Sequence, residues 1–115
     1  MLDLLERFKE IVRAYRVVSY EQEGNSYRIK VEINLIDDSQ LFMKEYLFEN
    51  AERKYAFHWS DRQGNLLCRW DDSPHWPNLR TFPHHKHVGT NVLDSRETTL
   101  EEVLLRIAEE LKGRK

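Results

Sequence analysis

Tyr27-Arg28-Ile29-Lys30-Val31-Glu32-Ile33-Asn34-Leu35 alternates apolar and polar side chains at every step. A period of two residues is typical of a strand with one face in the core and the other face in water. Gly24-Asn25 before this stretch and Asp37-Asp38-Ser39-Gln40 after it favour tight turns. Strands joined by such short turns pair in antiparallel fashion, because parallel strands need a long crossover connection.

Further strands are predicted on both sides of this stretch. The segment before it is rich in β-branched and aromatic residues, and the segments after it alternate or form a hairpin around Asp61-Arg62-Gln63-Gly64-Asn65. The predicted strands are residues 16–23, 27–35, 41–48, 55–59 and 66–70. The irregular segment rich in proline and histidine that follows is a candidate for a sixth strand.

Both ends of the chain have the apolar spacing of amphipathic helices. At the N-terminal end the apolar positions are Leu4, Leu5, Phe8, Ile11, Val12 and Tyr15. At the C-terminal end they are Leu100, Val103, Leu104, Ile107 and Leu111, preceded by two overlapping capping boxes at Thr98 and Thr99 and followed by Gly113. We therefore predict an α+β fold: an antiparallel β-sheet of five to six strands, with both helices packed on one face and the other face available.

The chain has 115 residues, and we expect residues 1–115 to form a single domain. Hydrophobic residues make up 40% and charged residues 33% of the sequence, which is typical of a soluble globular protein. No apolar run approaches the roughly 20 residues of a membrane helix, and the first residues do not have the pattern of a signal peptide. Because Cys68 is the only cysteine, an internal disulfide is excluded. We expect a cytoplasmic protein.

The net charge of −2 argues against non-specific binding over a long stretch of nucleic acid, because such binding needs many phosphate contacts. The charge is unevenly distributed, however. Residues 53–87 contain six basic and three acidic residues, whereas the rest of the chain contains twelve and seventeen. All histidines, tryptophans and prolines lie within residues 58–87, so any chemistry is expected there.

The hairpin of residues 55–70 indicates which side chains share a face. If Phe57, Trp59 and Trp70 point into the core, the period of two sends His58, Arg69 and Asp71 to the other face. A two- or four-residue loop would place His58 opposite Arg69 or diagonal to it, whereas a bulge would break this inference. These groups could bind an anion. On the hairpin alone, a solvated face with an Arg–Asp ion pair is the simpler interpretation.

The segment Asp71-Asp72-Ser73-Pro74-His75-Trp76-Pro77 predicts an ordered turn stiffened by two prolines. Such a turn could hold His75 and Trp76 in fixed positions toward a substrate. An ordinary rigid loop, with Trp76 as a lid on the core, explains the composition equally well.

Residues 82–89, Phe-Pro-His-His-Lys-His-Val-Gly, are the strongest local signal. If this segment is extended, His85 and His87 share one face, and His84 and Lys86 share the other. Histidines can supply a general base and a general acid near neutral pH, and nearby cations can stabilise an anionic transition state. Metal ligation together with His75 or Asp71 is an alternative, and so is a fortuitous basic stretch.

Acid–base chemistry by histidines suits an RNA phosphodiester, because RNA carries its own nucleophile in the 2′-hydroxyl. One histidine would remove that proton, another would protonate the departing 5′-oxygen, and no metal is required. Aromatic side chains could stack on unpaired bases. For Trp59 and Trp70 the hairpin pattern favours core packing instead, which leaves Trp76 as the best stacking candidate.

Three blocks of the sequence resemble the TumE family, small prokaryotic toxins of toxin–antitoxin systems. They are residues 55–61 (Tyr-Ala-Phe-His-Trp-Ser-Asp), 69–75 (Arg-Trp-Asp-Asp-Ser-Pro-His) and 81–89 (Thr-Phe-Pro-His-His-Lys-His-Val-Gly). The likeness covers most of the chain. It implies a toxin acting on RNA that is neutralised by a DNA-binding antitoxin of the helix-turn-helix type, encoded beside it.

From the chemistry of the residues we predict an endoribonuclease that needs no cofactor, and the resemblance implies that it is the toxin of a type II system. The predicted roles are acid or base for His85 and His87, with His58 third; anion stabilisation for Arg69 and Lys86; orientation by Asp71; and substrate contacts by His75, Trp76 and His84. The alternatives are a non-catalytic module that binds protein or nucleic acid, and a metal-dependent hydrolase. The oligomeric state and the RNA target are left open.

Overall fold

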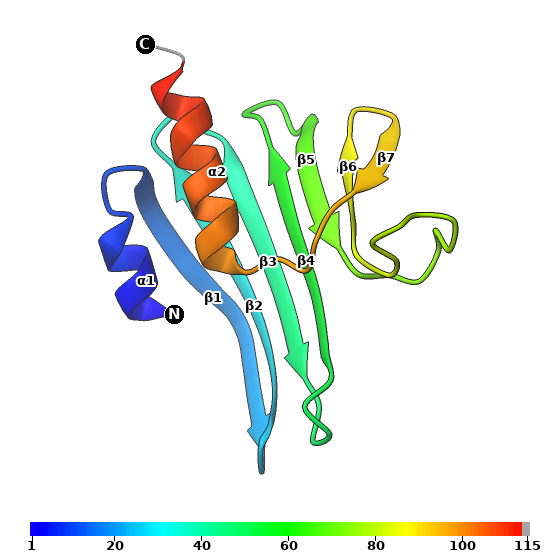
Figure 1. Cartoon of the computed structure of the whole chain (residues 1–115). Coiled ribbons are helices and arrows are strands. Elements are labelled where there is room, and N and C mark those ends of the chain that lie inside the picture. The colour runs from blue at the N-terminus through cyan, green and yellow to red at the C-terminus, as the bar shows by residue number, and fades with distance from the viewer. Residues whose placement is uncertain (114–115) are drawn as a thin grey trace.

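The computed structural model describes residues 1–113, which form one seven-stranded antiparallel sheet and two helices (Figure 1). Each strand pairs with its neighbours in the chain, so the spatial order β1 to β7 is also the sequence order. The elements are α1 (Leu2–Arg7), β1 (Val12–Glu23), β2 (Ser26–Leu35), β3 (Gln40–Leu47), β4 (Arg53–Ser60), β5 (Leu66–Asp71), β6 (His85–Val88), β7 (Asn91–Asp94) and α2 (Leu100–Lys112). The predicted α+β class is confirmed.

The sheet has more strands than the five to six predicted. The histidine-rich segment forms β6, and the chain then turns at Gly89, whose φ is +60°, to form β7. A left-handed residue of this kind favours glycine and permits a tight hairpin. β7 has only four residues, too few to show an alternating pattern in the sequence.

The N-terminal helix is shorter than its apolar spacing predicted. α1 ends at Arg7, and Val12 and Tyr15 belong to the twelve-residue strand β1. The prediction was wrong here because the apolar residues near position 12 fit either a helix or the start of the β-branched and aromatic strand that follows. Pairing with β2 stabilises the strand.

The two helices pack on the same face of the sheet and leave the other face open (Figure 1). Thr99 caps α2, since its hydroxyl accepts the backbone N–H of Glu102. Fully buried apolar residues from both layers make the core, among them Ile33, Leu35, Leu41, Phe57, Leu104 and Ile107. Among residues 1–113, no helix is both long and apolar enough to cross a membrane.

The registers of β4, β5 and β6 position the chemistry of the protein. His58 lies directly opposite Arg69, as the hairpin predicted, because the bulge in this pair of strands lies beyond Trp59 and leaves their register intact. On the next strand, Arg69 lies opposite His87. The loop of residues 72–84, which contains a cis Phe82–Pro83 peptide bond, connects β5 to β6.

Candidate active site

Imidazole, guanidinium and carboxylate groups meet on the open face of the sheet, where β4, β5 and β6 lie side by side. The registers arrange them in two cross-strand rows, His58–Arg69–His87 and Ala56–Asp71–His85. Because neighbouring strands lie about 4.8 Å apart, side chains in these rows are within reach of one another. The structure thus brings together five of the predicted site residues, which we call the His–Arg–Asp cluster: His58, Arg69, Asp71, His85 and His87.

A continuous chain of polar contacts joins these five side chains. Arg69 Nη1 lies 3.2 Å from His58 Nδ1, and Arg69 Nε donates to Asp71 Oδ2 at 3.0 Å. Asp71 Oδ1 lies 2.9 Å from His85 Nε2, and Asp71 Oδ2 lies 3.5 Å from His87 Nε2. Asp71 is therefore the centre of the cluster.

Asp71 is an ionised carboxylate at neutral pH although it is buried. Burial alone would raise the pKa of Asp71, but the backbone N–H of Ser73 and the cationic groups of His85 and Arg69 outweigh it and hold the pKa below the ordinary value of 3.8. Its negative charge in turn orients the three groups that surround it. The role of orienter that we predicted for Asp71 agrees with this position.

His85 is held more tightly than a substrate-facing residue needs. Only 1% of its surface is exposed, and its Nδ1 lies 2.9 Å from the carbonyl oxygen of Pro83. Both ring nitrogens of His85 lie within hydrogen-bond distance of an oxygen, the Pro83 carbonyl on one side and Asp71 on the other, so both polar positions of the ring are engaged. His85 therefore lies on the same face of the sheet as the rest of the cluster but is buried there, paired with Asp71 and closed to solvent.

His58 and His87 are the more accessible imidazoles. Burial and the adjacent Arg69 lower the pKa of His58. Because a guanidinium only donates hydrogen bonds, His58 Nδ1 accepts from Arg69, which describes a neutral ring. Burial also lowers the pKa of His87; the charge of Asp71 opposes that shift, while His85 and Arg69 reinforce it. Both rings are neutral at pH 7 and flank Arg69 from either side.

Trp76 in the loop of residues 72–84 forms one wall of the cluster. The centroid of its ring lies 6.4 Å from that of His85 and 6.3 Å from that of His87, edge-on in both cases. Trp76 is 38% exposed, whereas Trp59 and Trp70 are buried in the core, as the hairpin pattern predicted. His75 is exposed on the same loop, away from the polar contacts of the cluster.

The structure does not bring Lys86 or His84 to the cluster. The period of two turns Lys86 to the helix side of the sheet, where it lines a small cavity of about 160 Å³ with Trp70 and Arg106. The ring of His84 stacks on Tyr55, and its Nδ1 lies 2.9 Å from the Tyr55 hydroxyl. The anion-stabilising role predicted for Lys86 therefore needs correction, because this residue points away from the histidines.

Asp71, His85 and His87 could also hold a metal ion, because one ligand atom from each lies within 4.8 Å of the others. Two imidazoles and a carboxylate suit zinc or a similar divalent ion. The Pro83 carbonyl on His85 Nδ1 resembles the outer hydrogen bonds that orient metal-binding histidines. Against this, the guanidinium of Arg69 already occupies an oxygen of Asp71 and places a positive charge beside the ion.

Sequence reasoning missed two features of the site. A main-chain carbonyl such as that of Pro83 leaves no signal in a sequence. A groove of about 310 Å³ beside His58 and Arg69 is lined by Lys30, Phe42 and Lys44. The alternation in β2 and β3 could have found these three residues, because it places them on the same face as His58.

The comparison with protein families agrees with the likeness that the three sequence blocks suggested. The model of the family described as "Toxin TumE" matches residues 1–115. The chain belongs to the TumE family. Searches of curated proteins and of solved structures found no match for it.

Membership of the TumE family supports a toxin role, and a toxin of this kind has an antitoxin partner. All three family-like blocks supply the cluster. Residues 55–61 contribute His58, which β4 places opposite Arg69. Residues 69–75 contribute Arg69 and Asp71, and residues 81–89 contribute His85 and His87, which β5 and β6 place side by side. The sequence features by which the TumE family is recognised in this chain thus converge on one site.

Proposed function

We propose that this TumE-family protein is an endoribonuclease, the toxin of a type II toxin–antitoxin system in the cytoplasm, which cleaves RNA with histidine acid–base chemistry. The observation that supports this proposal is the cross-strand row His58–Arg69–His87. In this row a cation stands between two accessible imidazoles on an open face. A phosphate bound at Arg69 would have one ring on each side.

The reaction starts with the 2′-hydroxyl of the substrate. His87 removes its proton, and the resulting oxygen attacks the adjacent phosphorus. The bond from phosphorus to the 5′-oxygen breaks, and that oxygen takes a proton from His58. The products are a 2′,3′-cyclic phosphate and a 5′-hydroxyl, so atoms and charge balance. Arg69 neutralises the charge that builds up on the phosphorane oxygens.

The two imidazoles divide the roles according to their neighbours. Asp71 Oδ2 lies 3.5 Å from His87 Nε2, so the carboxylate stabilises the positive charge that His87 gains as a base. Among the described residues, His58 has no carboxylate partner. Burial and the adjacent Arg69 lower the pKa of His58, which makes its protonated form a ready donor. We assign His85 a positioning role through Asp71, in place of the acid–base role that the sequence predicted, because its ring is buried.

The test is cleavage of a defined RNA oligonucleotide by pure protein in EDTA. Loss of general acid or base catalysis costs about 10²- to 10⁴-fold, so His87→Ala and His58→Ala should each slow cleavage by at least a hundredfold. Arg106→Gln, on the exposed side of α2, is the control and should cleave normally. Unchanged cleavage in both histidine variants would remove the row from the mechanism, and stoichiometric RNA binding with no product would favour a non-catalytic module.

A metal-dependent hydrolase is the second candidate, favoured by the convergence of Asp71, His85 and His87. It makes the opposite prediction in the same assay. EDTA would abolish cleavage, and Zn²⁺ or Mn²⁺ would restore it. The partner that we propose is a helix-turn-helix antitoxin encoded beside the toxin gene.

A further inference from the structure

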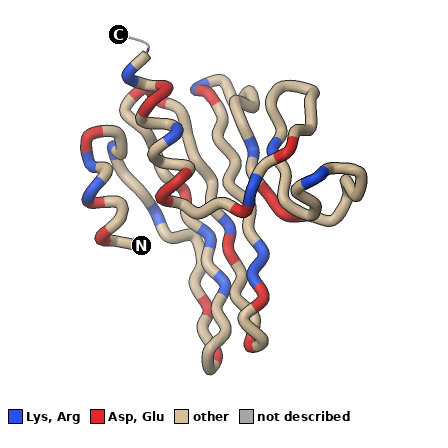
Figure 2. The backbone as a smooth tube through the Cα atoms, viewed as in Figure 1, with Lys and Arg blue, Asp and Glu red and all other residues tan. Residues whose placement is uncertain are grey.

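The open face of β2–β4 presents basic residues that the acid–base chemistry does not use. Arg28 and Lys30 on β2, Lys44 on β3 and Lys54 on β4 are all exposed, and the registers place them on the same face as His58. Figure 2 shows basic and acidic positions along the part of the sheet that extends below α2. Basic residues thus continue from the His–Arg–Asp cluster along β4 and across β3 and β2.

Two of these lysines face each other. Lys30 and Lys44 lie directly opposite in the register of β2 and β3. Like charges in this arrangement destabilise a sheet. Their cross-strand neighbours are Ser19 on β1 and Ala56 on β4, which offer no negative charge. Glu32 is the only acid at the outward positions of the described strands β2–β4, and Arg16 pairs with it at 2.9 Å. Among the described residues neither lysine forms an ion pair, although Glu32 lines the same groove, so this pair of facing cations favours an anionic ligand.

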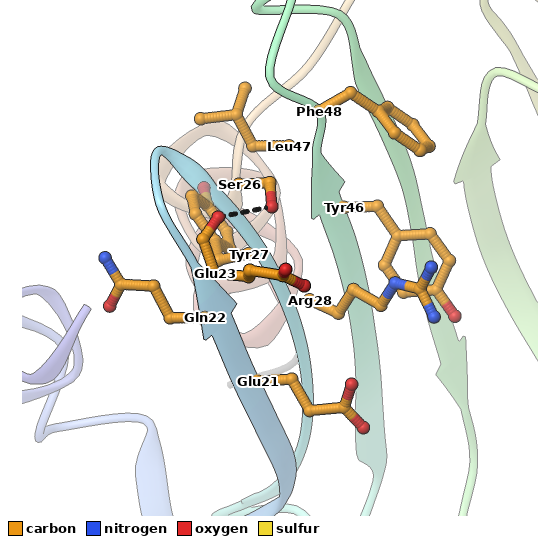
Figure 3. Close-up of a pocket in the computed structure, with 9 residues that line it drawn as sticks. All are labelled: Glu21, Gln22, Glu23, Ser26, Tyr27, Arg28, Tyr46, Leu47 and Phe48. Carbon is orange, nitrogen blue, oxygen red and sulfur yellow. Dashed lines mark hydrogen bonds between the residues drawn. The ribbon is translucent and has the colours of Figure 1, made fainter.

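Aromatic rings lie between the cations. Phe42 is 39% exposed and lies directly opposite His58. The guanidinium of Arg28 lies 5.4 Å from the centre of the Tyr46 ring, and the ammonium of Lys44 lies 5.9 Å from it. Figure 3 shows Arg28 extended across Tyr46 at the far end of the sheet. Exposed aromatic side chains among basic residues are the usual platform for unpaired bases.

We propose that Lys30, Phe42 and Lys44, which we call the β2–β3 platform, bind single-stranded RNA and guide it to the His58–Arg69–His87 row. This inference rests on the proposed function and adds the substrate class, unpaired RNA, and its path. Phe42 stacks on a base beside the cleaved bond, and the lysines hold the flanking phosphates. The groove of about 310 Å³ connects the platform to His58 and Arg69. The cations around Phe42 favour a polyanion over a protein partner, whose binding would need a larger apolar surface than the exposed Phe42 and Val18 provide.

The experiment measures binding rather than cleavage. The probe is a fluorescein-labelled 2′-O-methyl RNA of twelve nucleotides, which lacks the nucleophilic hydroxyl and stays intact on the wild-type protein. Lys30→Gln/Lys44→Gln should weaken binding and flatten the slope of log K against log salt by about 0.7 for each phosphate that is no longer neutralised. Phe42→Ala should weaken binding about tenfold, as expected when one base no longer stacks on an aromatic ring.

Matched variants on the helix side serve as controls. Lys9→Gln/Lys112→Gln makes the same change in charge, and Tyr20→Ala removes an aromatic ring that is 55% exposed on that side. Both should bind as the wild type does. The variant without Lys30 and Lys44 should melt at or above the wild-type temperature, because a repulsive pair is removed, so weaker binding there cannot come from unfolding.

Each outcome of the binding experiment tests one part of the proposal. Wild-type affinity in both platform variants, or no detectable binding at low salt, would overturn the proposal. Equal affinity for a duplex of the same sequence would overturn the stacking role of Phe42. Since the probe cannot be cleaved, loss of binding in the platform variants together with normal binding by the helix-side controls would support the platform even if the acid–base mechanism failed.

Discussion

At the scale of single residues, the lowered pKa values of His58 and His87 determine how activity should depend on pH. The proposed reaction needs one ring protonated and the other neutral. The product of those two fractions is largest between the two pKa values. Both are lowered from the ordinary value of 6.5, so kcat/KM should reach its maximum below pH 6.5. The measurement is a pH–rate profile on a defined RNA oligonucleotide, and a maximum above pH 7 would contradict the assignment.

Asp71→Asn tests whether Asp71 positions His87 through its charge. The carboxylate raises the pKa of His87 against the effect of burial. Removing the charge should therefore shift the maximum of the profile further toward acid, besides lowering the rate. A merely structural role would reduce the rate without moving the profile. Circular dichroism would establish that the variant is folded.

At the scale of elements, the strands that bear the site were predictable and the packing of the loop over it was not. Alternation in residues 27–35 and 55–70 fixed which side chains face outward, and it correctly paired His58 with Arg69. The same alternation, applied to an extended β6, placed His85 and His87 on one face of the strand and Lys86 on the other. It could not show that His85 becomes buried, because that depends on how a loop without periodicity folds back over the sheet.

The loop of residues 72–84 should therefore control access to the buried histidine. In the wild type, carbethoxylation by diethylpyrocarbonate should be fast at the exposed His75 and slow at His85, which is 1% exposed. Trp76→Ala removes the ring that lies against both His85 and His87. Modification of His85 should then accelerate while that of His75 stays constant, as followed by peptide mass spectrometry. Equal rates at His85 in the two proteins would show that Trp76 does not shield it.

At the scale of the whole molecule, the fold places its stability on the helix side of the sheet and its chemistry on the open side. The apolar core joins α1 and α2 to one face, so the outward residues of β2–β6 contribute little hydrophobic burial. Those positions instead hold repelling lysines and partly desolvated histidines, which lower the stability of the fold. Because the apolar core lies on the helix side of the sheet, unfavourable charges on the open face do not disrupt its packing.

The free energy of unfolding should therefore fall as the solution becomes acidic, in two stages. A histidine with a lowered pKa in the folded state costs stability as the pH falls below 6.5, because the unfolded chain then binds the proton more readily. Asp71, whose pKa is also lowered, contributes stability above pH 3.8 that is lost as the pH falls through its folded-state pKa. Urea titrations at successive pH values measure both stages.

His58→Gln should remove part of the first stage and leave the second unchanged, since Gln does not titrate and Asp71 keeps its partners. The same loss of stability between pH 6.5 and 5 in this variant and in the wild type would mean that His58 is not desolvated in the folded protein. In that case the acid maximum expected for cleavage would also lose its basis, because both effects depend on the burial of His58 beside Arg69. The open face would then be more solvated than its geometry indicates.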